Sequence, residues 1–307
     1  DSIRKPAAYG GVVGYKPTYG RISRYGLFAF ASSLDHMGLF ARSVKDVSYV
    51  MDIIKGHDDK DMTSLPDENI SYVNNLSNDV KGKKLFYIKE ALEIDNGNEN
   101  LKEVLNNFYF VIDKCKAIGI EVEGVSFRKD LLEAIYPAYN VISCAEATSN
   151  NSNLTGIPFG SRVEAGNVYD IMMKTRTEGF SEPIKRRFVI GSYVLQKENQ
   201  EKLFLNASRV RRLIVDRMNE LFKKYNGLIM PTSGDIAPLF DKASDKLSDE
   251  YLILGNHLVI GNFGGFPSIS IPSGFVNNMP VSINITGRAR EDYLVLNMAN
   301  KIEEVLG

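Results

Sequence analysis

The residue best placed for nucleophilic chemistry is Ser2, which comes immediately before a segment typical of a short helix. Pro6 suits the first turn of such a helix because its missing N–H costs no hydrogen bond there, and Gly10 and Gly11 can end it. Backbone N–H groups and the positive end of the helix dipole would favour negative charge near the serine oxygen. A serine in front of a helix is more often a simple N-cap. Position alone therefore leaves both roles open for Ser2.

Other familiar catalytic patterns are absent from the sequence. The chain has three histidines, His36, His57 and His257, and no Gly-x-Ser-x-Gly elbow, so a Ser-His-Asp triad is not indicated. It contains no Gly-x-x-x-x-Gly-Lys-Ser/Thr loop, no Gly-x-Gly-x-x-Gly fingerprint and no His-Glu-x-x-His site. We therefore expect no nucleotide cofactor and no metal bound by this chain.

Hydrophobic spacing predicts the elements that would hold the serine in place. Ser43 begins a capping-box pattern, and apolar residues at helical spacing follow from Val44 to Ile54. A strand over 84–88, a helix over 101–118 and an alternating strand over 120–125 form a β-α-β unit. Such a unit implies parallel pairing within a larger sheet.

The rest of the chain adds further strands and helices. Residues 57–79, rich in Asp, Asn and Ser, are interpreted as a long surface connection. Apolar spacing predicts a long helix over about 200–225, strands over 228–230, 268–272 and 281–285, and a closing helix over 294–306. The arginines of the long helix alternate with acidic residues and are interpreted as a solvated face. The fold class is therefore α/β with a mixed sheet.

Composition places the chain among ordinary globular proteins. It has 307 residues, a hydrophobic fraction of 44% and a formal net charge of -1, so no basic footprint for nucleic acid is indicated. Its two cysteines, Cys115 and Cys144, form no Cys-x-x-Cys motif and do not suggest a disulfide framework. No apolar run reaches the length of a membrane span, and we expect no signal peptide. We expect a reduced, cytoplasmic protein.

Longer motifs around and beyond Ser2 resemble the amidase signature family. The resemblance starts with residues 2–8, 11–14 and 16–21. It is most specific for the A subunits of glutamyl-tRNA(Gln) amidotransferases, through residues 24–26, 29–35, 38–42, 176–180, 185–187, 231–232 and 265–272. These motifs run from residue 2 nearly to the end of the chain.

The resemblance implies a fold, a mechanism and site residues. The fold would be a single amidase-signature domain over 1–307, with a mixed central β-sheet covered by helices on both faces. Ser2 would be the nucleophile of a Ser-cisSer-Lys mechanism that hydrolyses glutamine through an acyl-enzyme. Arg187 would bind the α-carboxylate of glutamine, a task suited to the planar fork of a guanidinium. Tyr139 would line the glutamine pocket.

The resemblance also implies partners. The family forms a heterotrimer in which the B subunit uses ATP and Mg²⁺ on glutamyl-tRNA and receives the ammonia, and a small C subunit wraps the junction. Contact with tRNA would therefore be indirect, and the A subunit needs no cofactor of its own.

The sequence departs from the family pattern at three points. Asp1 stands where the family usually has glycine before the nucleophile. The catalytic Lys and the cis-Ser of the family lie N-terminal to this segment, so we expect an N-terminally truncated chain, holding the C-terminal two-thirds of the fold and inactive alone. Where the family has an aspartate for the glutamine ammonium group, the nearest candidates are Asn256 and His257. Two alternatives stay open: a stand-alone amidase for a small or acyl amide, and a non-catalytic assembly scaffold.

Overall fold

The computed structural model describes residues 1–92, 99–239 and 253–307. The chain divides into two compact units. Unit 1 comprises Asp1–Tyr25, His36–Ile135 and Leu213–Gly307, and unit 2 comprises Gly26–Asp35 and Tyr136–Arg212. In the described ranges, no helix has the length and apolarity needed to cross a membrane. The prediction of one amidase-signature domain over 1–307 stays a prediction.

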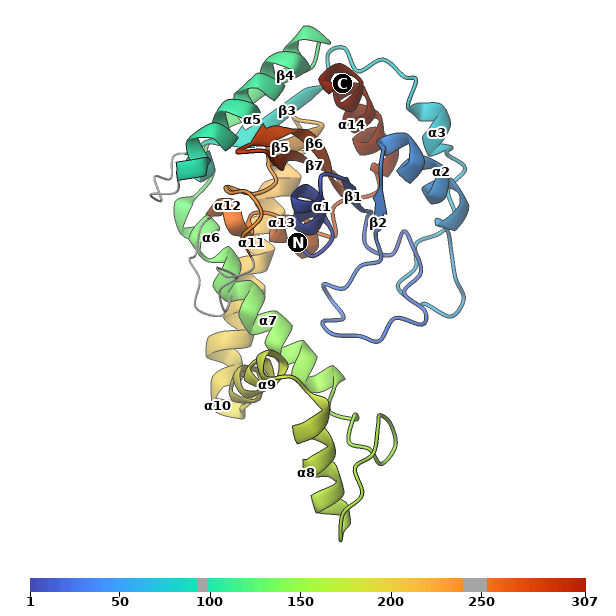
Figure 1. Ribbon diagram of the computed structural model, residues 1–307, viewed down its shortest axis with the longest axis vertical. Coiled ribbons are helices and arrows are strands. Elements are labelled where there is room, and N and C mark those ends of the chain that lie inside the picture. Colours follow the sequence, from blue (N-terminus) through green and yellow to red (C-terminus); the bar gives the residue numbers. More distant parts are fainter. Residues whose placement is uncertain (93–98, 240–252) are drawn as a thin grey trace. The chain divides into compact units, whose positions relative to one another are not determined.

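Unit 1 is built on a mixed sheet. In its described part the sheet has seven strands in the order β2-β1-β6-β7-β5-β3-β4 (Figure 1). The strands are β1 (Val13–Lys16), β2 (Leu39–Ala41), β3 (Lys84–Ile88), β4 (Glu121–Val125), β5 (Gly227–Pro231), β6 (Ser268–Val276) and β7 (Met279–Gly287). β3 pairs in parallel with β4 and β5, and the remaining pairs are antiparallel. This arrangement confirms the predicted mixed sheet and the parallel β-α-β unit, whose helix is α5 (Glu99–Ala117).

The two faces of the sheet differ in chemistry. β6 and β7 alternate, so that one face carries the buried polar residues Ser268, Ser270, Asn284 and Thr286, while the other carries Ile269, Ile271, Ile283 and Ile285. Strict alternation with period two separates the two sets. The sheet therefore has one polar and one apolar buried face.

Helices cover both faces, as the resemblance predicts. A Cβ added at Gly14 of β1, which pairs with Ser270, would lie 2.4 Å from the Ala7 Cβ of α1 (Arg4–Gly10). A Cβ added at Gly287 would lie 2.2 Å from Val295 of α14 (Asp292–Leu306). The short helix α1 thus covers the polar face, and the closing helix α14 covers the apolar face (Figure 1).

Smaller helices complete unit 1. They are α2 (Val44–Ile54), α3 (Tyr72–Asn75), α4 (Lys89–Leu92), α6 (Lys129–Glu133), α12 (Ile253–Asn256) and α13 (Val259–Phe263). Ser43 caps α2 as predicted, because its hydroxyl accepts a hydrogen bond from the backbone N–H of Asp46.

Residues 57–79 are not simply a surface connection. They contain α3, whose Tyr72 is fully buried. The carboxylate of Asp52 accepts hydrogen bonds from the N–H groups of Tyr72 and Val73 and from the Ser71 hydroxyl. A carboxylate from a neighbouring helix thus anchors this segment, a contact that the local composition does not reveal.

Unit 2 is helical in the described residues. It is formed by most of α7 (Ile135–Asn150), by α8 (Val168–Gly179), α9 (Glu182–Val194), α10 (Lys197–Gln200) and the π-helical turn η1 (Glu201–Leu205), and by the start of α11 (Asn206–Leu221). The predicted helix over 200–225 is therefore interrupted by η1. α9 packs closely on α7 at Gly191, where a Cβ would lie 2.1 Å from the Cys144 carbonyl oxygen.

Burial makes Cys115 a test of the packing of unit 1. Burial raises the pKa of its thiol to about 12. An unfolded cysteine has a pKa of about 8.5, so the unfolded chain loses this proton first and stability should fall as the pH rises above that value. We expect iodoacetamide at pH 8.5 to leave Cys115 unmodified in the native protein and to alkylate it in guanidinium chloride, as measured by peptide mass mapping. The exposed variant Asn219→Cys is the reactive control, and equal native reactivity of Cys115 would contradict the packing.

Candidate active site

Ser2 lies in the turn that leads into α1 and is exposed. The N-cap position of α1 belongs to Ile3, and no side chain caps this helix start. The first turn is closed instead by backbone, with the Lys5 N–H donating to the Asp1 carbonyl at 2.9 Å. Ser2 therefore does not serve as the helix cap in this structure.

Arg4 fixes the start of α1 against the polar face of the sheet. Its side chain is 1% exposed. Its Nη1 donates to the Leu258 carbonyl and to the Ser268 hydroxyl, both at 2.9 Å, and its Nη2 donates to the Asn262 side-chain oxygen at 2.6 Å. Burial lowers the pKa of Arg4 to about 9. The guanidinium thus joins the helix that follows Ser2 to α13 and to β6.

The acceptors for Arg4 belong to a larger buried network. Ser268 contacts the Thr286 hydroxyl at 2.8 Å and accepts from the Asn284 amide at 3.1 Å. The same amide donates to Ser270 at 3.2 Å. The hydroxyls of Ser268, Ser270 and Thr286 are each held by a neighbour, so Ser268 meets Arg4 in a fixed arrangement.

Lys16 places a second buried cation near Arg4. Its Nζ donates to the Pro17 carbonyl at 3.0 Å and to the Phe266 carbonyl. Burial and then the charge of Arg4 hold the pKa of Lys16 well below its ordinary value, although Asp292 opposes them.

A Cβ at Gly261 would lie 2.7 Å from Arg4 Nη1, so this position suits glycine because the guanidinium approaches the backbone closely.

Asp292, at the start of α14, is a fully buried carboxylate of unit 1. It accepts hydrogen bonds from the Tyr15 hydroxyl at 2.7 Å and from the Thr18 backbone N–H at 2.8 Å, as well as from the Thr18 hydroxyl. The Nε of Arg21 lies 3.9 Å away. Burial, followed by the charge of Asp292, raises the pKa of Tyr15 well above its ordinary value. One carboxylate thus holds both the strand β1 and the loop that follows it.

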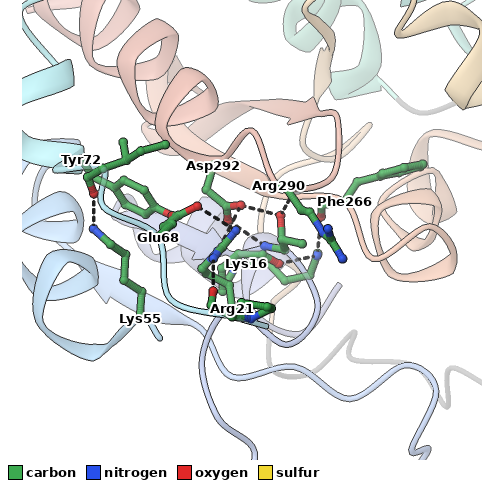
Figure 2. Close-up of polar contacts among 12 residues, drawn as sticks. Lys16, Arg21, Lys55, Glu68, Tyr72, Phe266, Arg290 and Asp292 are labelled. Atoms are coloured by element: carbon green, nitrogen blue, oxygen red, sulfur yellow. Dashed lines mark hydrogen bonds and ion pairs between the residues drawn. The ribbon is translucent and has the colours of Figure 1, made fainter. Parts of the chain in front are cut away.

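The polar contacts continue from Asp292 toward α2. Figure 2 shows Arg21, Glu68 and Tyr72 in succession between Asp292 and Lys55. Arg21 pairs with Glu68 at 2.9 Å, and Glu68 accepts from the Tyr72 hydroxyl. The Lys55 ammonium lies 4.1 Å from the centroid of the Tyr72 ring. This chain of contacts ties residues 57–79 to the start of α14.

Arg187 lies on α9 of unit 2. It is half-buried, and its guanidinium carbon lies 5.7 Å from the centroid of the Phe30 ring. Its charge also acts on the buried Cys144 thiol of α7, although burial dominates and raises the pKa of that thiol. Within the described residues Arg187 forms no ion pair. Its fork is therefore not engaged by a carboxylate of this part of the protein.

The other predicted residues have separate surroundings. Tyr139 is half-buried on α7, with its ring centroid 6.5 Å from that of Tyr136. Ser2 belongs to unit 1, whereas Tyr139 and Arg187 belong to unit 2. His257 is buried, and its Nδ1 lies 3.1 Å from the Leu254 carbonyl. Neither His257 nor Asn256 supplies a carboxylate for an ammonium group.

Sequence reasoning missed the three buried charges that support α1 and β1: Arg4, Lys16 and Asp292. Each stands among residues that suit an ordinary helix turn or strand end. A buried charge needs partners, and most of these partners are more than 240 positions away, as the contacts of Arg4 with Leu258 and of Lys16 with Phe266 show. The one available signal was Lys16 within an otherwise apolar strand.

Comparison with known proteins agrees with the mixed α/β fold. The family model described as Amidase matches residues 1–296, and the chain belongs to this family.

Several A subunits of glutamyl-tRNA(Gln) amidotransferase are similar to it. The subunit of Thermotoga maritima is 36% identical over 303 residues, which are 99% of this chain and 62% of the relative. The subunit of Desulforamulus reducens is 38% identical over 306 residues, which are 99% of this chain and 61% of the relative.

Solved structures agree in fold. The crystal structure of the Thermotoga maritima subunit has a TM-score of 0.77 at 32% identity, and the match covers 99% of this chain and 60% of that chain. A bacterial aryl acylamidase has a TM-score of 0.76 at 20% identity over 99% of this chain and 60% of its own, which shows the fold alone. The chain thus spans 60–62% of the length of the relatives described here.

The buried Asp292 allows a direct test of the network. Asp292→Asn should lower the free energy of unfolding by about 3 kcal/mol, because it removes a buried charge near Arg21 and turns an acceptor into a donor toward Thr18. Its neighbour Glu291, with a side chain 32% exposed and 3.9 Å from Arg288, is the matched control. Both variants are compared with the unmodified protein by urea titration. Glu291→Gln should lower the free energy of unfolding by less than about 0.5 kcal/mol. Equal costs for the two variants would contradict the role given to Asp292.

Proposed function

We propose that this chain is the glutamine-hydrolysing portion of a glutamyl-tRNA(Gln) amidotransferase A subunit. The main support is the identity of 36–38% to such subunits across 99% of the chain. A second support is local, because Ser2 is exposed and does not cap α1. The proposal concerns the whole protein, of which these residues form a part.

In this proposal Ser2 Oγ attacks the side-chain amide carbon of glutamine. A bond forms between Oγ and that carbon, the C–N bond breaks, and the serine proton is passed to the departing nitrogen to give ammonia. Water then hydrolyses the glutamyl ester and restores the serine. An amide is a poor electrophile, so the step needs an activated nucleophile and donors for the oxyanion. The resemblance assigns activation to a Lys and a cis-Ser outside these residues, and residues 1–307 alone are therefore predicted to be inactive.

Arg4 acts as a positioning residue for Ser2. It is two residues from the serine, it is buried, and it is held by three acceptors at 2.6–2.9 Å. Such a contact limits the freedom of the turn that carries the nucleophile. Positioning of this kind accounts for a large part of many enzymatic rate enhancements.

Arg187 and Tyr139 would recognise the amino-acid end of glutamine. A carboxylate and a guanidinium can form two parallel hydrogen bonds, which distinguishes glutamine from a simple amide. Arg187 has the cation–π contact with Phe30 to orient its plane, and no carboxylate of the described residues occupies its donors. Tyr139 would contribute its ring and hydroxyl to the same ligand.

The ammonia would serve a partner. In the proposed cytoplasmic heterotrimer, the B subunit binds ATP, Mg²⁺ and glutamyl-tRNA(Gln), and the C subunit stabilises the junction. The net charge of -1 supports an indirect role in tRNA binding, since a direct nucleic-acid surface is normally basic.

The role of Ser2 is tested by Ser2→Ala in the full-length protein assembled with its B and C subunits. We expect glutaminase kcat/KM to fall by at least about a thousandfold with unfolding stability unchanged, because the nucleophile is removed. Ser43→Ala is the matched control, since Ser43 does cap a helix. Ser43→Ala should lower the free energy of unfolding by about 1 kcal/mol and leave the glutaminase activity unchanged. Activity that survives Ser2→Ala would favour the scaffold alternative.

The role of Arg187 is tested by comparing two amides. Arg187→Ala should raise the KM for glutamine by about tenfold to a hundredfold, the cost of losing a charged hydrogen bond, and should leave a neutral aliphatic amide unaffected. Arg186→Ala, at the exposed neighbouring position, is the control. Equal losses for glutamine and the neutral amide would contradict carboxylate recognition.

A further inference from the structure

Two opposite charges flank Ser2. The Lys5 ammonium lies 3.7 Å from the Asp1 carboxylate, at positions i and i+4 around the first turn of α1. The Asp1 side chain is 40% exposed and the Lys5 side chain only 17%. The exposed Ser2 is therefore adjacent to the Asp1 carboxylate, and the ammonium that pairs with this carboxylate is on the following turn.

Lys5 is held on both sides. Besides the contact with Asp1, its Nζ donates to the Gly255 carbonyl of α12 at 3.0 Å. Burial lowers the pKa of Lys5 because it disfavours the charged form. The ammonium therefore needs partners that stabilise its charge. The Gly255 carbonyl supplies a dipole. Among the described residues, the Asp1 carboxylate supplies the negative charge with which the ammonium forms an ion pair.

The carboxylate of Asp1 conflicts with the chemistry proposed for its neighbour. Attack by Ser2 on an amide develops negative charge on the carbonyl oxygen, and a nearby carboxylate would oppose both this charge and the deprotonation of the serine. The interaction is strong because a partly buried site screens charge less than water does.

We propose that Lys5 is a charge-balancing positioning residue. Its ammonium offsets the charge of the Asp1 carboxylate beside the nucleophile, so that the developing oxyanion does not face an uncompensated negative charge. The proposal rests on the function proposed above and adds a residue to it. It also explains how an aspartate is compatible with catalysis at a position where the resemblance leads us to expect glycine.

A purely structural role for Lys5 makes a different prediction. If its contact with the Gly255 carbonyl were what mattered, the loss of Lys5 would be equally harmful with or without Asp1. If Lys5 balances Asp1, removing both charges should restore the glutaminase activity that is lost when Lys5 alone is removed. A double-mutant cycle separates these roles.

The cycle uses Lys5→Met, Asp1→Asn and the double variant in the full-length protein with its B and C subunits. We expect Lys5→Met to lower kcat/KM for glutamine at least about tenfold, mainly through kcat. Asp1→Asn should equal or exceed the wild type, the double variant should return to within about threefold of it, and Lys5→Arg should keep most activity.

Thermal unfolding of each variant guards against a folding defect, and the double variant keeps the test informative if Lys5→Met is unstable. Equal impairment of Lys5→Met and the double variant, or no impairment of Lys5→Met, would overturn the proposal. Ser2→Ala is measured alongside. If activity survives Ser2→Ala, the proposed function fails; if activity depends on Ser2 but ignores the Asp1–Lys5 pair, only the present inference fails.

Discussion

Burial of the Arg4 guanidinium is the constraint on which the rest of unit 1 depends. A buried cation needs hydrogen-bond partners, and losing them costs several kcal/mol. Both terminal nitrogens of Arg4 have such partners, whereas its buried Nε has none among the described residues. The acceptors come from Leu258, Asn262 and Ser268, on segments far along the chain. The helix α1, the α13 region and the polar face of β6 and β7 must therefore assemble together. The position of Ser2 follows from that assembly, because it is two residues from the anchored side chain.

The sheet separates two charge systems. On the polar face, Arg4 and Lys16 place two cations among hydroxyl and carbonyl acceptors. On the apolar face, Asp292 gathers Tyr15, Thr18 and Arg21. β1 contributes to both, since its successive residues Tyr15 and Lys16 point to opposite faces. The charges thus hold one short strand from both sides and leave the serine turn exposed at the surface.

Local signals in the sequence predicted much of this fold. Gly11 ends α1 in the left-handed conformation, with φ 65°, and Ser43 caps α2, because each effect acts over one helical turn. The β-α-β unit followed from periodicity in the same way. The roles of Arg4 and Asp292 could not be predicted, since they depend on partners that only the folded chain brings near. Ser2, Arg187 and Tyr139 were found through resemblance, and the structure describes them in two separate units.

In the proposed function, a buried arginine places the serine, and a lysine balances the aspartate beside it. The step on which this proposal depends is the acylation of Ser2 by the side chain of glutamine. The most direct measurement is covalent trapping in the assembled full-length enzyme with a glutamine-derived diazoketone, followed by peptide mass spectrometry. We expect one adduct, on the peptide that contains Ser2, formed in step with the loss of glutaminase activity. Inactivation with the adduct on another residue, and with Ser2 unmodified, would contradict it.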